Sequence, residues 1–187
     1  MGLIDTTEEN LAEGHIVLVT VGTTKFDALI KAIDSLSLAN LLVSRGYTKL
    51  IIEAGVSDYR FENLFEQSSK VEQIHRIGNG LTVEWFEYAP TLVPYLDSAS
   101  LVISHTGAGS IFEALRRGLP CIAVPNAILM DDHQKELVEK LAARGHLAQA
   151  LPSNLEDVVR TFEPDALVPY VPGNPQGIIE EIDALFS

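Results

Sequence analysis

The stretch of sequence that decides the fold is VISHTGAGSIFEALRRGLPCIAVP, residues 102–125. It begins as an apolar run of strand length, turns at two glycines, continues as a short amphipathic segment and ends in a second apolar run. A strand, a helix and a second strand in this order form the repeating unit of a parallel sheet. We therefore predict an α/β protein with a Rossmann-like open parallel sheet and flanking helices.

The rest of the chain repeats this alternation. Short apolar runs are separated by segments in which apolar residues recur with the period of a helix. The predicted strands are residues 16–21, 50–53, 81–86, 101–104 and 121–124, with a further short strand after residue 145. The predicted helices are residues 26–35, 91–99, 110–117 and 132–144.

Composition narrows the class of protein. The chain has 187 residues, of which 47% are hydrophobic and 21% are charged, as in a globular domain of ordinary size. No apolar run approaches the roughly 20 residues of a membrane-spanning helix. A single cysteine allows no disulfide within the chain, so we expect a cytoplasmic protein.

The net charge of −13 disfavours nucleic acid and anionic membranes as partners. Any anionic ligand must therefore be held locally, by backbone N–H groups.

The two ends of the chain differ from its body. The first six residues, MGLIDT, match an N-myristoylation pattern, but no basic residue lies nearby to supply a second membrane signal, so an ordinary N-terminus is favoured. Residues 163–175 contain four prolines and are predicted to form an extended arm. The last residues predict an amphipathic helix, which either packs back on the domain or docks on a partner protein. We thus divide the chain into a domain, residues 1–162, and an arm with a terminal helix, residues 163–187. The apolar stripe of that helix comprises Ile178, Ile179, Ile182, Leu185 and Phe186.

The glycine turn after residue 104 is the first candidate site. In an open parallel sheet, ligands bind beyond the carboxyl ends of the strands, where loops lead into helices. Gly107 and Gly109 allow the backbone to approach a ligand closely, and Ser110 can cap the helix or donate its hydroxyl to a phosphate. A diphosphate fits this geometry, although an ordinary tight turn explains the same residues. Phe112 stands where a dinucleotide fingerprint needs its third glycine, and no Gly-Lys-Ser/Thr motif is present, so NAD and ATP are disfavoured.

Further polar residues are predicted to lie at the same edge of the sheet. Gly22 and Thr23 follow the first strand. Glu113 lies off the buried face of its helix, where a carboxylate can accept two hydrogen bonds from a ribose, or simply face solvent. Asp131, Asp132 and His133 are contiguous, so their side chains diverge and a metal ion is disfavoured there. The recognition of sugar hydroxyls suits this loop better, and the residues expected to do it are Asp132, His133 and Gln134.

Together these motifs resemble a known family. HTGAGSIFEALRRGLPCIAVP followed by MDDHQKELVEKL resembles the donor-binding, C-terminal lobe of GT-B glycosyltransferases related to the bacterial GlcNAc transferase of lipid II synthesis. The chain is also similar, from VLVTVGTTKFDALI to NPQGIIEEIDALFS, to the small subunits of the eukaryotic UDP-N-acetylglucosamine transferases that act on GlcNAc-diphosphate-dolichol. The resemblance therefore covers nearly the whole chain.

The resemblance implies roles for the candidate residues. The glycine turns and Ser110 would face the donor diphosphate, Glu113 the ribose, and residues 132–134 the transferred sugar. The strand end at Trp85, Phe86 and Glu87 would border the uracil. His105 is a candidate general base, although the base could also lie on a partner chain.

The resemblance also implies a divided enzyme. A GT-B transferase has an acceptor lobe and a donor lobe, and this chain is long enough for only one of them. The expected partners are UDP-GlcNAc and a membrane-anchored subunit that binds the dolichol-linked acceptor on the cytosolic face of the endoplasmic reticulum. We expect an inverting transferase that acts only with this subunit, without metal or cofactor. A noncatalytic scaffold domain that binds a nucleotide or UDP-sugar is the alternative.

Overall fold

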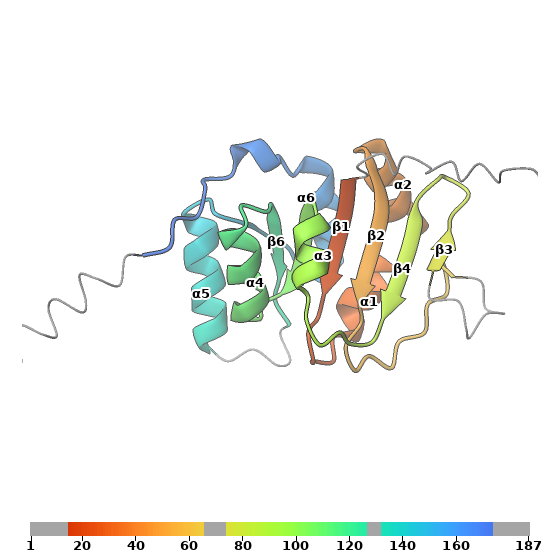
Figure 1. Ribbon diagram of the computed structural model, residues 1–187, viewed down its shortest axis with the longest axis horizontal. Coiled ribbons are helices and arrows are strands. Elements are labelled where there is room, and N and C mark those ends of the chain that lie inside the picture. The colour runs from red at the N-terminus through yellow and green to blue at the C-terminus, as the bar shows by residue number, and fades with distance from the viewer. Residues whose placement is uncertain (1–14, 66–73, 127–131, 174–187) are drawn as a thin grey trace, which may run out of the picture.

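The computed structural model describes residues 15–65, 74–126 and 132–173, with side chains from residue 136 in the last segment (Figure 1). The strands are β1 (His15–Thr20), β2 (Tyr47–Glu53), β3 (Ile74–Arg76), β4 (Thr82–Phe86), β5 (Leu101–His105), β6 (Cys121–Val124) and β7 (Ala148–Gln149). The helices are α1 (Asp27–Ile33), α2 (Leu36–Ser44), α3 (Val93–Ser98), α4 (Ala108–Arg116), α5 (Asp132–Ala143) and α6 (Leu155–Thr161), with 3₁₀ turns at Pro152–Asn154 and Pro164–Ala166.

The strands form one sheet in the order β3-β4-β2-β1-β5-β6-β7. All neighbouring strands are parallel except β3, which pairs antiparallel with β4 at one edge. From β1 the chain first builds outward through β2 and β4, and then returns to place β5 on the other side of β1. The gap between β1 and β5 is therefore the topological switch point, where open α/β sheets bind ligands. The predicted Rossmann-like α/β sheet is confirmed.

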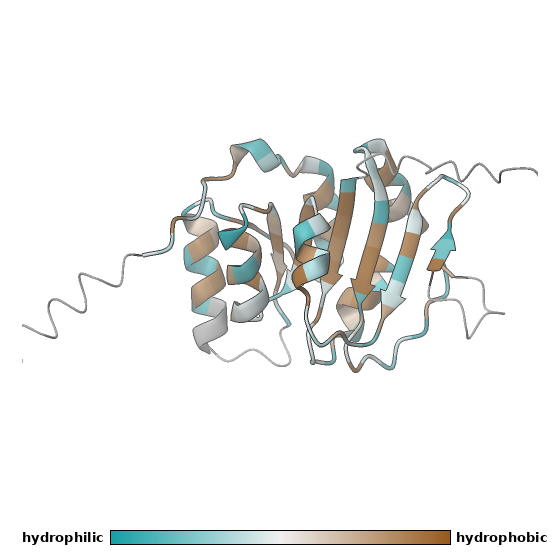
Figure 2. Ribbon diagram, viewed as in Figure 1, coloured by the Kyte–Doolittle hydropathy of each residue, from teal (hydrophilic) through white to brown (hydrophobic). Residues whose placement is uncertain are grey.

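The sheet is covered on both faces (Figure 1). On one face, α1, α2 and α6 pack on side chains such as Val17, Val19 and Ile103. On the other face, α3, α4 and α5 pack on Leu18, Val102 and neighbouring residues. The central strands are therefore apolar on both sides, as Figure 2 shows, and they read as continuous apolar runs in the sequence.

Three elements were not predicted. Residues 26–35 were expected to form one helix, but Ser35 begins a second, because its side chain accepts a hydrogen bond from Leu38 N–H and caps α2. The short edge strand β3 and helix α6 were also missed. The α4 prediction began two residues late, since the helix starts at Ala108 with Gly107 as its N-cap.

The proline-containing arm is described as far as residue 173. Val168 N–H donates to Gly145 O (2.9 Å), and the Val168 carbonyl lies 2.9 Å from His146 Nδ1, so this part of the arm lies against the end of α5. The Tyr170 ring packs on Phe112 of α4, with 5.6 Å between ring centroids. The division at residue 162 stays a prediction, and the predicted terminal helix lies outside the described residues.

Candidate functional site

Buried polar side chains gather at the switch point. Six polar or charged side chains are buried in the described part of the chain, and all but Asp34 lie in or just after the carboxyl ends of the central strands. The rest of the buried sheet is lined by apolar side chains, and burying a polar group costs free energy unless it has a partner. These polar residues therefore mark the edge of the sheet at which a polar ligand is expected. The five residues are Thr20, Glu53, Ser104, Thr106 and Asn126.

His105 joins the two glycine turns. The backbone of Gly22, which follows β1, and that of Gly107, which follows β5, both lie against its imidazole ring. A Cβ atom at Gly22 would lie 2.9 Å from His105 Cε1, and one at Gly107 would lie 2.6 Å from His105 Nε2. Only glycine leaves room for the ring at both positions. The structure thus brings together the two turns predicted from the sequence, with a histidine between them.

The protonation state of His105 follows from its surroundings. Its Nδ1 lies 3.2 Å from the carbonyl oxygen of Thr20, which accepts a hydrogen bond from the tautomer protonated at Nδ1. Burial lowers the pKa of the imidazole, and the hydrogen bond to Thr20 and the charge of Glu53 offset this only in part. His105 is therefore neutral at pH 7 with its Nε2 lone pair free to accept a proton, as a general base requires. Its catalytic role stays a prediction.

The start of α4 offers backbone donors. Within the described structure no side chain caps this helix, and its first intrahelical bond runs from Ile111 N–H to Gly107 O. The N–H groups of Ala108, Gly109 and Ser110 therefore precede the hydrogen-bonded ladder. Together with the helix dipole, they form a site that suits a phosphate. Ser110 lies within the first turn and is not the N-cap, so of its two predicted roles only the donation of its hydroxyl to a ligand remains.

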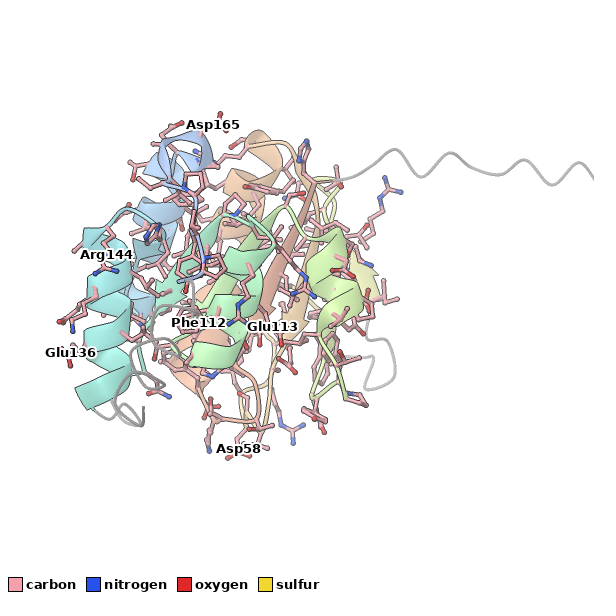
Figure 3. All side chains as sticks on the ribbon, turned by 60° about the vertical axis from the view of Figure 1, so that its left-hand side comes forward. Asp58, Phe112, Glu113, Glu136, Arg144 and Asp165 are labelled. Atoms are coloured by element: carbon pink, nitrogen blue, oxygen red, sulfur yellow. The ribbon has the colours of Figure 1, made fainter. Side chains whose placement is uncertain are left out.

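Glu113 lies on the flank of α4. Ile111, Ala114 and Leu115 are buried as predicted, and the Glu113 side chain is 47% exposed. Figure 3 shows Glu113 on the side of α4 toward α3, and Phe112 on the side toward α5. Arg117 stands 4.0 Å from the Glu113 carboxylate but donates at 2.9 Å to Asp97. Most of the acceptor capacity of Glu113 is thus left for a ligand.

The predicted uracil border is divided between two faces of the sheet. Phe86 lies on the α3 face, where its ring packs on Tyr95 with 4.8 Å between centroids. Trp85 points to the opposite face and packs on Phe61 and Phe65. Strand side chains alternate, so Phe86 and Trp85 cannot contact the same ligand ring.

The third predicted loop also reaches the switch point. Asn126, just after β6, donates from its side chain to the carbonyl of Lys25, which follows the Gly22 turn (3.1 Å). Asp132, His133 and Gln134 form the first turn of α5, and their side chains lie outside the described residues. The partner-binding stripe at residues 178–186 also lies outside them.

Cations are scarce at this edge. Lys25 forms ion pairs with both Asp27 and Asp58, and the hydrogen bond to Asp58 is the largest cause of its raised pKa. Because Lys25 is already paired with two carboxylates, the negative charge of a ligand at this edge would be stabilised by the backbone N–H donors. In the segments that the structure covers, no group of three acidic, His or Cys side chains is placed to hold a metal ion. No helix in these segments is long and apolar enough to cross a membrane.

Sequence reasoning missed some residues of the site. Gly55, after β2, has a φ of +60°, and a Cβ atom there would lie 2.4 Å from Thr24 O and 2.7 Å from Gly22 O. Glu53 was predicted only as the end of a strand. The signal that could have found both is the sequence IIEAG, in which a carboxylate and a glycine follow directly on a buried run.

Fold and site together define the chain as a Rossmann-like lobe whose switch-point edge carries backbone donors of the kind that suit a phosphate. The family model described as glycosyltransferase family 28 C-terminal domain matches residues 16–174. The chain belongs to this family, which confirms the resemblance deduced from its motifs.

Relatives and solved structures agree with this assignment. The chain is 31% identical to the "UDP-N-acetylglucosamine transferase subunit ALG13" of Cryptococcus neoformans, over 81% of this chain and 85% of that protein. It is 37% identical to the human protein of the same name, over 70% of this chain and 10% of that longer protein. An NMR structure of ALG13 superposes with a TM-score of 0.64 at 26% identity, covering 93% of this chain and 98% of the other. MurG of Acinetobacter baumannii shares the fold, with a TM-score of 0.55 at 17% identity, over 82% of this chain and 43% of that one.

Proposed function

We propose that this chain is the donor-binding, catalytic subunit of a two-subunit UDP-N-acetylglucosamine transferase. Its substrate would be N-acetylglucosaminyl-diphosphodolichol, to which it would add the second GlcNAc of the lipid-linked oligosaccharide used in N-glycosylation. Family membership and the name shared by its relatives support the reaction class. The observation that carries the proposal is the uncapped start of α4, packed beside the Gly22 turn through His105.

The donor UDP-GlcNAc would lie across the carboxyl ends of β1 and β5. Its diphosphate would accept hydrogen bonds at the start of α4, from Gly109 and Ser110, with the turn at Gly22 and Thr23 alongside. The Glu113 carboxylate would accept hydrogen bonds from both ribose hydroxyls. Phe86 would border the uracil, and residues 132–134 would contact the transferred sugar.

The chemistry would be a single displacement with inversion at the anomeric carbon. The backbone donors and the dipole of α4 stabilise the negative charge that develops on the leaving UDP, so no metal is needed. One general base deprotonates the attacking hydroxyl. His105 is the candidate in this chain, and the alternative is a base on the partner subunit.

The acceptor would be bound by a membrane-anchored partner. We place this chain on the cytosolic face of the endoplasmic reticulum, held there by that subunit. The terminal stripe of Ile178, Ile179, Ile182, Leu185 and Phe186 would contribute to docking. Deletion of residues 177–187 should abolish co-purification with the membrane subunit while the circular dichroism of the chain stays native. Full recovery of the partner would refute this docking role.

Donor binding is tested by calorimetric titration of UDP-GlcNAc into the full chain, with NAD as the comparison ligand. Glu113→Ala should weaken UDP-GlcNAc binding by about 1–3 kcal/mol, because hydrogen bonds to the ribose are lost. Glu136→Ala is the matched control, since Glu136 is an exposed glutamate on α5 that pairs with Lys140. Equal affinity of the two variants would overturn the ribose assignment.

Transfer is tested on the complex with the membrane subunit and a dolichol-linked acceptor. Donor binding without transfer by this complex would favour the alternative, a noncatalytic domain that binds UDP-sugars. Absence of UDP-GlcNAc binding, alone and in the complex, would exclude both functions.

A further inference from the structure

Thr20 connects three parts of the candidate site. Its hydroxyl donates to the carboxylate of Glu53 at 2.5 Å, and the hydroxyl oxygen accepts the N–H of Gly22 at 3.2 Å. Its backbone carbonyl lies 3.2 Å from Nδ1 of His105. Thr20 and Glu53 are neighbours in the register of β1 and β2, which fixes their separation. One buried residue thus contacts the second strand, the glycine turn and the histidine between the turns.

The direction of these hydrogen bonds depends on the carboxylate. The Glu53 carboxyl oxygen accepts the hydrogen bond that the Thr20 hydroxyl donates. The lone pairs of that hydroxyl are then directed to the N–H of Gly22. Gly22 has a φ of +58°, a conformation that an adjacent hydrogen bond helps to hold. The Gly22 N–H is therefore occupied inside the protein, and it sets the turn in place without binding the ligand itself.

We propose that Thr20 and Glu53 are positioning residues for donor binding. They fix the Gly22 turn and His105 against the start of α4, and so preset the distance between the two sides of the diphosphate site. This inference rests on the proposed function, because it assigns these two residues to the UDP-binding site. Neither residue touches the donor.

The experiment separates positioning from mere support of the fold. A single Thr20→Val change leaves the Glu53 carboxylate buried without its donor, which destabilises the fold whatever its role. The double variant Thr20→Val with Glu53→Leu replaces both partners by apolar groups and leaves no buried charge. Its urea midpoint should stay close to that of the wild type. The Kd for UDP should nevertheless rise about tenfold, since the turn has lost a hydrogen bond that held it.

Two further variants serve as controls. Thr20→Ser keeps the hydroxyl and should keep wild-type affinity for UDP. Asp34→Asn alters a buried carboxylate elsewhere, which accepts hydrogen bonds from Tyr59 and from N–H groups of residues 62–64. It should lower the urea midpoint and leave the Kd for UDP unchanged.

The outcomes are distinct. A folded double variant that binds UDP as tightly as the wild type overturns the positioning role and leaves the proposed function intact. A wild-type chain that binds no UDP overturns both. If the double variant does not fold, amide hydrogen exchange of Gly22 in Thr20→Ser and in the variant Thr20→Ala with Glu53→Gln decides, because the second variant lacks the hydroxyl and leaves no buried charge. Protection lost in that second variant together with weaker UDP binding supports the role, and unchanged binding refutes it.

Discussion

Gly107→Ala tests whether the two turns are packed against the histidine as tightly as described. The backbone of Gly107 has φ −64° and ψ 116°, which suits any residue, so strain in the backbone does not contribute. The added Cβ atom would lie 2.6 Å from Nε2 and 2.8 Å from Cε1 of His105, far inside van der Waals contact. The ring cannot move freely, because Gly22 lies against it as well.

The expected cost is that of overpacking a half-buried site, about 1–3 kcal/mol of unfolding free energy. With a urea m-value of about 2 kcal/mol/M, unfolding followed by circular dichroism should therefore show the midpoint lowered by roughly 0.5–1.5 M. Gly109→Ala is the matched control, since no atom of the described residues lies within 4 Å of its Cβ position, and alanine favours the helix by up to about 1 kcal/mol. In a His105→Ala background, the cost of Gly107→Ala should largely vanish, because the clashing ring is gone. An equal cost in both backgrounds would refute this packing.

Three further predictions concern the same edge of the sheet. Gly55→Ala should destabilise the fold by more than about 3 kcal/mol in the same urea assay, because its Cβ would meet backbone oxygens of Thr24 and Gly22 that cannot rotate away. Burial lowers the pKa of His105, so below about pH 6.5 the folded chain binds fewer protons than the unfolded one. The full contribution of neutral His105 to the free energy of unfolding is therefore present above about pH 6.5. That contribution should be lost as the pH falls toward the folded pKa. His105→Asn should flatten that part of the urea-midpoint profile, and an unchanged slope would contradict the assignment. EDTA should leave transfer by the complex unaffected, and inhibition reversed by a divalent ion would count against the proposed mechanism.

The central part of the fold could be predicted from the sequence because its signals are local. Buried parallel strands are continuous apolar runs, and β5, β6 and α4 all lie within two residues of the predicted bounds. Of the elements that were missed, the edge strand β3 has no such signal. β3 has only three residues and alternates exposed and half-buried positions, and its pairing with β4 depends on contacts that a short segment does not encode.

The candidate site was predictable only in part, for a similar reason. Gly22 and Gly107 could be placed at one edge of the sheet, because both follow strands of a parallel arrangement. That His105 lies between them depends on the pairing of β1 with β5, which join at the switch point. Glu53 has a sequence signal in IIEAG, but its pairing with Thr20 is recognisable only once the register of β1 and β2 is known.

Cys121, at the start of β6, offers a built-in probe of how this sheet opens. It is the single cysteine of the chain, it is fully buried in the central sheet, and burial raises the pKa of its thiol to about 12. A thiol in this state reacts with disulfide reagents only in molecules whose sheet has separated, since both access and thiolate formation require solvent. The rate of labelling at Cys121 therefore reports the free energy of opening of the strands beside the switch point. The measurement needs no substitution in the chain and no denaturant.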